Sequence, residues 1–211
     1  MRLLSDRSPA RALHRLASDE QAAMIVVGAS ERGRVGLIRP GSTAERIVQG
    51  SPCPVAVAPS GYATREAGTL ERIGCGFDAQ PPAQAALARA ASLAVSAHAR
   101  LRVIAVFEPI AFGHIVPAQA VDLTSVNEAA RTALADQLRD AAAALEGVEV
   151  QSEFLQGDPG ATLVAQSESL DLLVVGSRGY GPLRSVLLGG VSGHVIHEAH
   201  CPVLVCSAQT L

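Results

Sequence analysis

The sequence predicts an α/β protein: a doubly wound parallel sheet, preceded by a carboxyl-terminal half-copy of the same domain. Three observations support this prediction. Short apolar runs alternate with helical segments from residue 70 to residue 207, which is the pattern of a parallel sheet with helices on both faces. One stretch of the chain repeats another. The composition, 48% apolar and 18% charged over 211 residues, is that of a globular protein.

The internal repeat pairs residues 24–58 with residues 172–206 at a constant offset of 148, without a gap. Nine of the 35 paired positions are identical, among them Cys-Pro-Val at 53–55 and at 201–203. The identities fall on glycines and apolar strand positions, where backbone geometry is hardest to substitute. The repeat is therefore a duplication.

Each copy predicts the same elements in the same order. A short apolar run suits a buried parallel strand, and a glycine-rich loop and a helix follow it. That helix ends before Cys-Pro, and a second apolar run forms another strand with proline at its start. The strands are expected at 24–27, 55–58, 172–175 and 203–206, and the helices begin near Gly41 and Gly189.

Much more of the chain precedes the second copy than the first. Further strands are expected there at 72–77, 101–107 and 148–155, with helices at 83–97, 127–145 and 160–169. The first copy is preceded by one helix, at about 9–17, so three strands and two helices have no counterpart. We expect a partial domain at 1–59, a linker at 60–68 and a complete domain at 69–211.

A half-domain with only its last two strands leaves one strand edge and one apolar face without a partner. We expect either that another chain covers them, or that the natural protein begins further upstream and has about 280–300 residues by the symmetry of the copies.

Composition and charge exclude several functions. The formal net charge of −3 argues against nucleic-acid binding. All 17 basic residues are arginine, which excludes a Walker-type lysine and Schiff-base chemistry. The four cysteines lack CxxC spacing and are interpreted as buried apolar residues. No apolar run is long enough for a membrane span and the start lacks a secretory signal, so a cytoplasmic location is expected.

Several motifs identify a known family. The pattern Gly176-x-x-Gly179, nine residues, then Gly189 resembles the phosphate loop of the universal stress protein family. The segments 172–179, Gly157-Asp158-Pro159 and Cys-Pro-Val-Leu-Val at 201–205 are also typical of it. The likeness covers residues 70–207 as a full domain and 8–59 as a carboxyl-terminal half. It implies strand order 3-2-1-4-5, adenine-nucleotide binding, frequent dimers or tandem copies, and a role in stress survival.

The glycine loop is also an anion site on physical grounds, because small residues let backbone N–H groups approach phosphate at a helix N-terminus. By resemblance, the cofactor contacts in the second copy are Gly176, Arg178, Gly179, Gly189, Gly190, Val191 and Ser192. The family pattern has Ser or Thr at the position where this chain has Gly190. Losing that hydroxyl costs about 0.5–1.5 kcal/mol, roughly three- to tenfold in affinity, and Ser192 is placed to substitute for it in part.

Two further residues enter the site by resemblance. Asp78, which closes the first strand of the complete domain, contacts the nucleoside, and Val106 lines the adenine pocket. This chain has Asp78-Ala79-Gln80 where the family often has Asp-Gly-Ser, so helix capping is an alternative role for Asp78. A solvated surface position is the alternative for Arg178.

No nucleotide is expected in the first copy. Its Gly41-Ser42-Thr43 is intact, but Glu31 replaces the second glycine and would repel phosphate. Two other signals are rejected. His194, His197 and His200 fan over too wide an arc of a helix for one metal, and Gly190–His194 lacks the last glycine of a nucleophile elbow.

The sequence therefore predicts a universal-stress-type protein that binds ATP, with or without Mg²⁺, or a related adenine nucleotide for regulation. No structural metal is expected. No general base or nucleophile is evident, although slow ATP hydrolysis stays open. The alternative is an assembly module that binds no nucleotide. The two copies are expected to pair through their last strands, and the chain is expected to form a homo-oligomer.

Overall fold

The computed structural model describes residues 5–28, 42–59, 62, 68–110, 122–177 and 189–207. Its strands are β1 (Ile25–Gly28), β2 (Val55–Ala58), β3 (Arg72–Gly76), β4 (Arg100–Phe107), β5 (Val150–Gln156), β6 (Leu172–Ser177) and β7 (Val203–Ser207). Its helices are α1 (Pro9–Asp19), α2 (Ser42–Val48), α3 (Pro81–Ala97), α4 (Leu123–Ala143), α5 (Pro159–Ser167) and α6 (Gly190–Glu198).

The described strands form one seven-stranded sheet in the order β1-β2-β7-β6-β3-β4-β5. Every neighbouring pair is parallel except β2 and β7, which are antiparallel, with Val57 opposite Val203 and Val55 opposite Val205. The chain is thus α/β with a mostly parallel sheet. The sheet is wider than the five strands expected for the complete domain because the β2–β7 pair adds the two amino-terminal strands to it.

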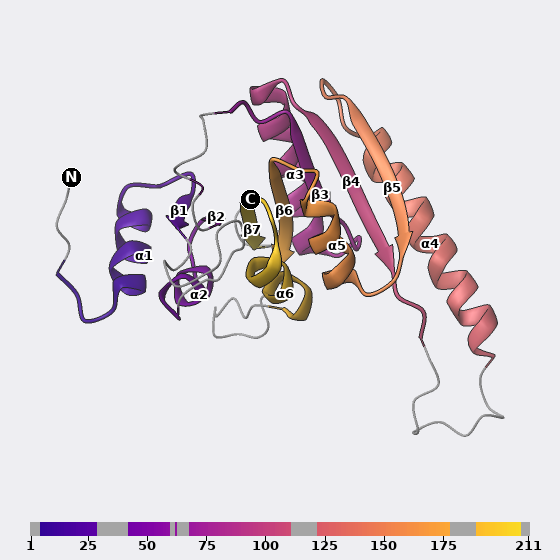
Figure 1. The fold of residues 1–211 in the computed structure, drawn as a ribbon, viewed down its shortest axis with the longest axis horizontal. Helices are drawn as coiled ribbons and strands as arrows, with labels where there is room; N and C mark the ends of the chain where they lie inside the picture. Colours follow the sequence, from indigo (N-terminus) through magenta and orange to yellow (C-terminus); the bar gives the residue numbers. More distant parts are fainter. Residues whose placement is uncertain are drawn as a thin grey trace.

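Helices cover both faces of this sheet. One hydrophobic cluster joins one face to α1, α2, α5 and α6, and includes Ile47, Leu163 and Val195. A second cluster lies under α3 and α4 on the other face, and includes Ala86 and Leu138. Figure 1 shows α1, β1 and α2 at one end of the molecule and α4 at the other, beside β5. The core is built from Ala, Val, Leu and Ile, as a sequence with 3% aromatic residues requires.

The element boundaries follow local capping chemistry. The α4 helix begins at Leu123, four residues before the expected start, because the Asp122 carboxylate accepts hydrogen bonds from the backbone N–H groups of Thr124 and Ser125. This is an ordinary N-cap. At α5, Asp158 accepts from the N–H of Ala161 at 2.7 Å, and Pro159 occupies the first helical position, which its fixed φ favours.

All four cysteines are free and buried, as the sequence predicts. Burial raises the pKa of the Cys206 thiol to about 12, and the nearby guanidinium of Arg89 opposes this only in part. Burial also raises the pKa of Cys75. Both thiols therefore stay protonated at neutral pH and serve as apolar core residues rather than as nucleophiles.

The loop before β6 is tied to the start of β3 by one carboxylate. Asp171 accepts hydrogen bonds from the backbone N–H groups of Glu71 at 3.0 Å and Arg72 at 2.8 Å, and it pairs with the Arg72 guanidinium at 3.0 Å. Burial acts to raise the pKa of the Asp171 carboxyl, but these hydrogen bonds outweigh burial and hold it below its ordinary value of 3.8. The ionised carboxylate therefore stabilises the β3–β6 pair.

Replacing Asp171 with alanine is expected to lower the free energy of unfolding at pH 7 by about 1–2 kcal/mol, since charge-assisted hydrogen bonds are lost at a half-exposed site. The folded-state pKa lies below the unfolded one, so this stabilisation is complete above the unfolded value and is lost as pH falls through the folded value. Urea unfolding at pH 7 and pH 3 measures both effects. Asp136→Ala, which breaks an exposed pair with Arg139, is the control and should cost less than about 0.5 kcal/mol.

Candidate functional site

A cavity of about 350 Å³ opens at the carboxyl ends of β3, β4 and β6. The described residues that line it are Gly76, Phe77, Asp78, Pro82, Ala83, Ile104, Val106, Pro159, Leu163, Val175, Gly176, Gly189, Gly190, Val191 and Ser192. The volume lies within the range of small-molecule sites. Seven of the nine residues expected at the site from the sequence are among these, so the fold brings them together.

The sheet topology explains why a cavity forms there. β3 lies between β4 and β6, and the chain leaves β3 toward β4 through α3 but reaches β6 only after α5. The helices on either side therefore cover opposite faces, which opens a crevice at the carboxyl ends of the strands. This reversal of strand order is the ordinary ligand position in a doubly wound sheet.

Gly176 lines the cavity. Its lack of a side chain is required by packing, which the sequence alone did not indicate. A Cβ atom built on Gly176 would lie 2.6 Å from the carbonyl carbon and oxygen of Pro82 and 2.7 Å from the nitrogen of Ala83. The β6 backbone thus packs directly against the first turn of α3. A side chain at this position would push strand and helix apart, whether or not a ligand is bound.

The apolar wall comes from β4 and α5. Val106 is half-buried on β4 and lies in the cavity, as expected from the resemblance. Leu163 of α5 also lines the cavity and packs closely over Gly76 of β3, since a Cβ built on Gly76 would lie 3.0 Å from a Leu163 methyl. Leu163 was not expected at the site from the sequence. The Gly157-Asp158-Pro159 signal placed the start of α5 correctly, but which face of α5 meets the sheet depends on tertiary packing.

The polar end of the cavity is the first turn of α6. Gly189 is the N-cap and offers no side-chain hydrogen bond. The first helical bond runs from the N–H of Gly193 to the carbonyl of Gly189 at 2.8 Å, so the N–H groups of Gly190, Val191 and Ser192 precede the helical ladder. These amides sit at the positive end of the helix dipole and suit an anionic group.

Gly190 has room for a larger residue. A Cβ built there meets no atom of the described residues within 4 Å, and its φ lies outside the left-handed region. The Ser192 side chain is 2% exposed, and its hydroxyl donates to the Gly189 carbonyl at 3.3 Å. A phosphate oxygen would therefore compete with a carbonyl for the Ser192 proton, whereas a hydroxyl at position 190 would have no such competitor among the described neighbours.

Asp78 lies at the cavity mouth, exposed, and shapes the turn into α3. Its Oδ1 accepts a hydrogen bond from the N–H of Gln80 at 3.1 Å, while Gln80 itself is the N-cap. The intervening Ala79 has φ of 60°, a left-handed conformation that favours glycine. The chain therefore carries a non-glycine residue where the family motif has the residue best suited to this backbone.

Two expected site residues, Arg178 and Gly179, lie outside the described residues. So do Glu31 and Gly41 of the first copy. Among the described residues that line the cavity, Asp78 alone carries a formal charge. The described part of the site would therefore bind an anionic group through backbone amides rather than through a cationic side chain.

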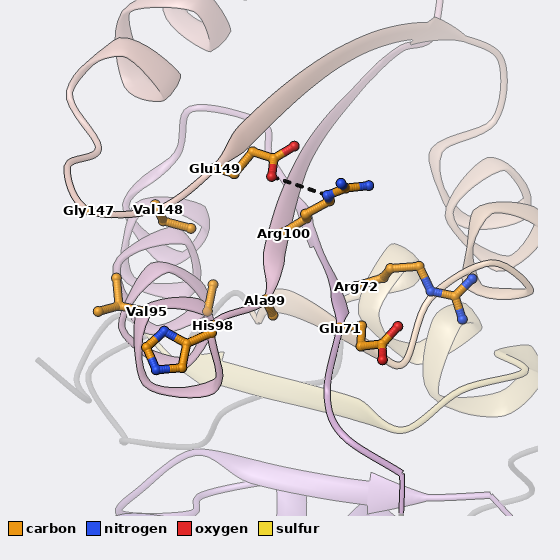
Figure 2. A pocket seen from close by; sticks show the side chains of 10 residues that line it. Glu71, Arg72, Val95, His98, Ala99, Arg100, Gly147, Val148 and Glu149 are labelled. Atoms are coloured by element: carbon orange, nitrogen blue, oxygen red, sulfur yellow. Dashed lines mark hydrogen bonds and ion pairs between the residues drawn. The ribbon is translucent and has the colours of Figure 1, made fainter.

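A larger hollow of about 620 Å³ lies at the opposite, amino-terminal ends of the strands. Figure 2 shows Arg100 and Glu149 paired at its rim, Glu71 and Arg72 on one side, and His98 and Val95 on the other. Arg72 is already bound by Asp171. The smaller cavity is the better candidate despite its size, because it is lined by apolar walls with converging backbone amides.

His194 and His197 lie on α6, but the helix ends at Glu198, so the expectation that His200 shares it is wrong, and the three histidines face three different carboxylates. His194 lies 3.4 Å from Glu198, His197 lies 3.2 Å from Glu45 on α2, and His200 lies 3.9 Å from Glu168. Within the described ranges, no three His, Cys, Asp or Glu side chains are grouped closely enough to hold a metal ion.

None of the helices in the described part of the chain is both long and apolar enough to cross a membrane.

The comparisons with known proteins agree with this fold. The universal stress protein family model matches residues 2–59 and 69–207, and the chain belongs to that family. A universal stress protein of Mycobacterium tuberculosis is 31% identical over 185 residues, which are 88% of this chain and 62% of that protein. A second one from the same organism is 29% identical over 206 residues, 94% of this chain and 69% of its own length.

Solved structures show the same architecture. A universal stress protein from Archaeoglobus fulgidus matches with a TM-score of 0.66 at 22% identity, covering 95% of this chain and 67% of that one. Another from Pseudomonas aeruginosa gives 0.68 at 17% identity, covering 96% and 69%. A universal stress protein in complex with cAMP gives 0.50 at 22% identity, covering 67% and 99%. The chain thus spans roughly two thirds of the length of its longer relatives.

Replacing Ala79 with glycine is expected to raise the free energy of unfolding by about 0.5–1 kcal/mol, because it removes the strain of a left-handed alanine. The matched control is Ala88→Gly on the exposed face of α3, which should lower stability by about 1 kcal/mol. Chemical denaturation of both variants makes the comparison. Equal losses in the two variants would show that position 79 does not adopt the left-handed conformation.

Proposed function

We propose that this chain binds ATP or a related adenine nucleotide in the cavity at the carboxyl ends of β3, β4 and β6, and acts in sensing or regulation. The observation that carries the proposal is the convergence, in one cavity, of an apolar wall at Val106 and Leu163 with the N–H groups of Gly190 and Val191. An adenine ring suits the first and a phosphate suits the second. Family membership and a relative that binds cAMP support the same ligand class.

The described residues fit such a nucleotide at both ends. The wall offers aliphatic side chains, and the α6 terminus offers amides beside Gly189 without a side-chain cap, where no described residue comes within 4 Å of a Cβ built at position 190. We propose that Asp78 contacts the nucleoside and that Gly176, Arg178, Gly179 and Ser192 complete the phosphate site. The bound nucleotide would carry any Mg²⁺ through its own phosphates, and the cytoplasm would be the place of action.

We also propose the domain organisation. Residues 69–211 form a complete universal-stress-type domain with strand order 3-2-1-4-5, residues 1–59 form a carboxyl-terminal half-copy, and residues 60–68 link them. The run β5-β4-β3-β6-β7 in the sheet and the two separate segments matched by the family model support this division. On this proposal, the β2–β7 pair is the junction of the two copies through their last strands.

An assembly module that binds no nucleotide is the second candidate. Gly190 favours it, because the family pattern has a hydroxyl residue there. The antiparallel β2–β7 pair favours it as well, because it shows these strand edges acting as an interface.

The direct test is isothermal titration of the full chain with ATP, with cAMP and with adenosine. The proposal predicts saturable binding of at least one phosphorylated nucleotide at micromolar to tens of micromolar concentration, about −6 to −8 kcal/mol. A folded sample that shows no binding up to millimolar concentrations of all three would favour the assembly module.

Substitutions at Gly190 test the phosphate end of the cavity. Gly190→Ser is expected to tighten ATP binding roughly three- to tenfold, because it adds one hydroxyl donor where a side chain has free space. Gly190→Asp is expected to weaken ATP binding by more than about tenfold, because a carboxylate then faces the phosphates. Both variants should fold, since a Cβ at this position meets no neighbour in the described ranges and Asp is favourable in a first helical turn.

Adenosine is the control ligand for these two variants, because it lacks phosphate. Its affinity should be nearly equal in the parent chain, Gly190→Ser and Gly190→Asp. If ATP affinity does not respond to either substitution, the α6 terminus is not the phosphate site.

A further inference from the structure

Arg102 on β4 forms an ion pair at an unusual depth for this protein. Its side chain is 18% exposed, and that of its partner Glu153 on β5 is 20% exposed. Other arginines that pair with carboxylates are 53–73% exposed, namely Arg15, Arg72, Arg100 and Arg139. Solvent and salt screen a partly buried pair less than a surface pair, so the geometry of the Arg102 pair constrains the groups around it.

The guanidinium of Arg102 donates from all three of its nitrogen atoms. Nε and Nη2 donate to the two carboxylate oxygens of Glu153 at 3.0 and 2.8 Å, and such a bidentate pair has a defined geometry. Nη2 also donates to Gln166 Oε1 at 2.6 Å, and Nη1 donates to the Ser169 hydroxyl at 2.8 Å. The Ser169 hydroxyl donates in turn to the Gln166 carbonyl at 3.0 Å. These hydrogen bonds join β4 to the carboxyl-terminal end of α5.

Arg102 belongs to the row of β4 residues that leads to the cavity wall. Side chains alternate between the two faces of a strand, so Arg102, Ile104 and Val106 share one face. Ile104 packs with Leu163 of α5 in one hydrophobic cluster, and Val106 and Leu163 both line the cavity. The α5 helix therefore runs along this row, with its first turns near Val106 and its last turn at Arg102.

The anchor at Gln166 lies close to Leu163 on the helix. The two residues are three positions apart on α5, so they share a face and are separated by about 4.5 Å along the axis. Leu163 itself is held by apolar contacts, which are non-directional and allow a helix to rotate or slide. Charge-assisted hydrogen bonds are directional. A bond from Arg102 to Gln166, less than one turn away, therefore limits the movement of Leu163.

We propose that Arg102 is a positioning residue of the nucleotide site, because its hydrogen bonds to Gln166 and Ser169 set the rotation of α5 and thereby the position of Leu163. This inference rests on the proposed function and adds to it a residue that is not among those lining the cavity. The loss of Arg102 should disturb the apolar end of the cavity, where the base binds. The amides at the start of α6 should keep their positions.

Isothermal titration of the full chain with ATP and with adenosine tests the proposal. Arg102→Met is expected to weaken both ligands by the same factor, roughly three- to tenfold, so that the ratio of their affinities stays constant. Arg100→Met is the matched control. Arg100 lies on the same strand but pairs with Glu149 rather than with α5, and its loss should leave both affinities at the parent values.

A double variant, Gln166→Ala with Ser169→Ala, tests the same contact without leaving Glu153 unpaired. It releases α5 while the Arg102–Glu153 pair remains, and it should reproduce the equal loss for both ligands. The methyl ¹H–¹³C signals of Leu163, recorded without ligand, give a second measurement. They should shift in Arg102→Met and in the double variant but not in Arg100→Met, a pattern that a uniform loss of stability does not produce.

The outcomes separate this inference from the proposed function. If the parent chain binds both ligands and the double variant has unchanged affinities or unchanged Leu163 signals, the inference is wrong and the proposed function stands. A larger loss for ATP than for adenosine would also overturn the inference, because it would place the effect at the phosphate end. A parent chain that binds neither ligand would overturn the proposed function and this inference with it.

Discussion

The direct contact between the β6 backbone at Gly176 and the first turn of α3 determines the geometry of the candidate site. With no side chain at Gly176, the carbonyl group of Pro82 lies within 2.6 Å of where a Cβ would stand. This contact fixes the start of α3 over the crevice between β3 and β6. Gly176, Pro82 and Ala83 all line the cavity, so this contact forms part of its wall. A glycine that the family pattern associates with phosphate is therefore also a packing requirement of the sheet.

A second constraint joins the two parts of the chain. The antiparallel β2–β7 pair makes a single sheet from strands that lie 148 residues apart in the repeat. Val55 and Val57 of β2 are fully buried, at 1% and 0% exposed, so the junction is part of the core. Val26 of β1 is 65% exposed, whereas the equivalent Val174 of β6 is buried under β3 and α3. Equivalent residues of the two copies therefore differ in how deeply they are buried, although their sequences are similar.

Much of this was predictable from the sequence. The offset of 148 identified equivalent strands. The β2 segment at 55–58 was predicted with its correct first and last residues, because apolar runs bounded by proline and glycine leave few possible strand boundaries. Seven of nine expected site residues meet in one cavity, since parallel strands bring their carboxyl ends to one edge of the sheet. The start of α4 was missed because the Asp122 cap acts before the apolar pattern begins. Leu163 and the role of Pro82 were missed because they depend on helix orientation against the sheet. The left-handed backbone conformation of Ala79 was not predicted, because the identity of one residue does not determine its φ angle.

The central claim is that the amides at the start of α6 and the wall around Val106 bind the two ends of one adenine nucleotide. The most direct test is the change in backbone ¹⁵N–¹H chemical shifts during a titration of the full chain with ATP. Saturating shifts are expected at Gly189, Gly190, Val191 and Ser192, together with Val106 and Leu163. Shifts confined to the opposite hollow, around Val95, His98 and Gly147, would contradict it. So would the absence of any saturating shift at millimolar ATP.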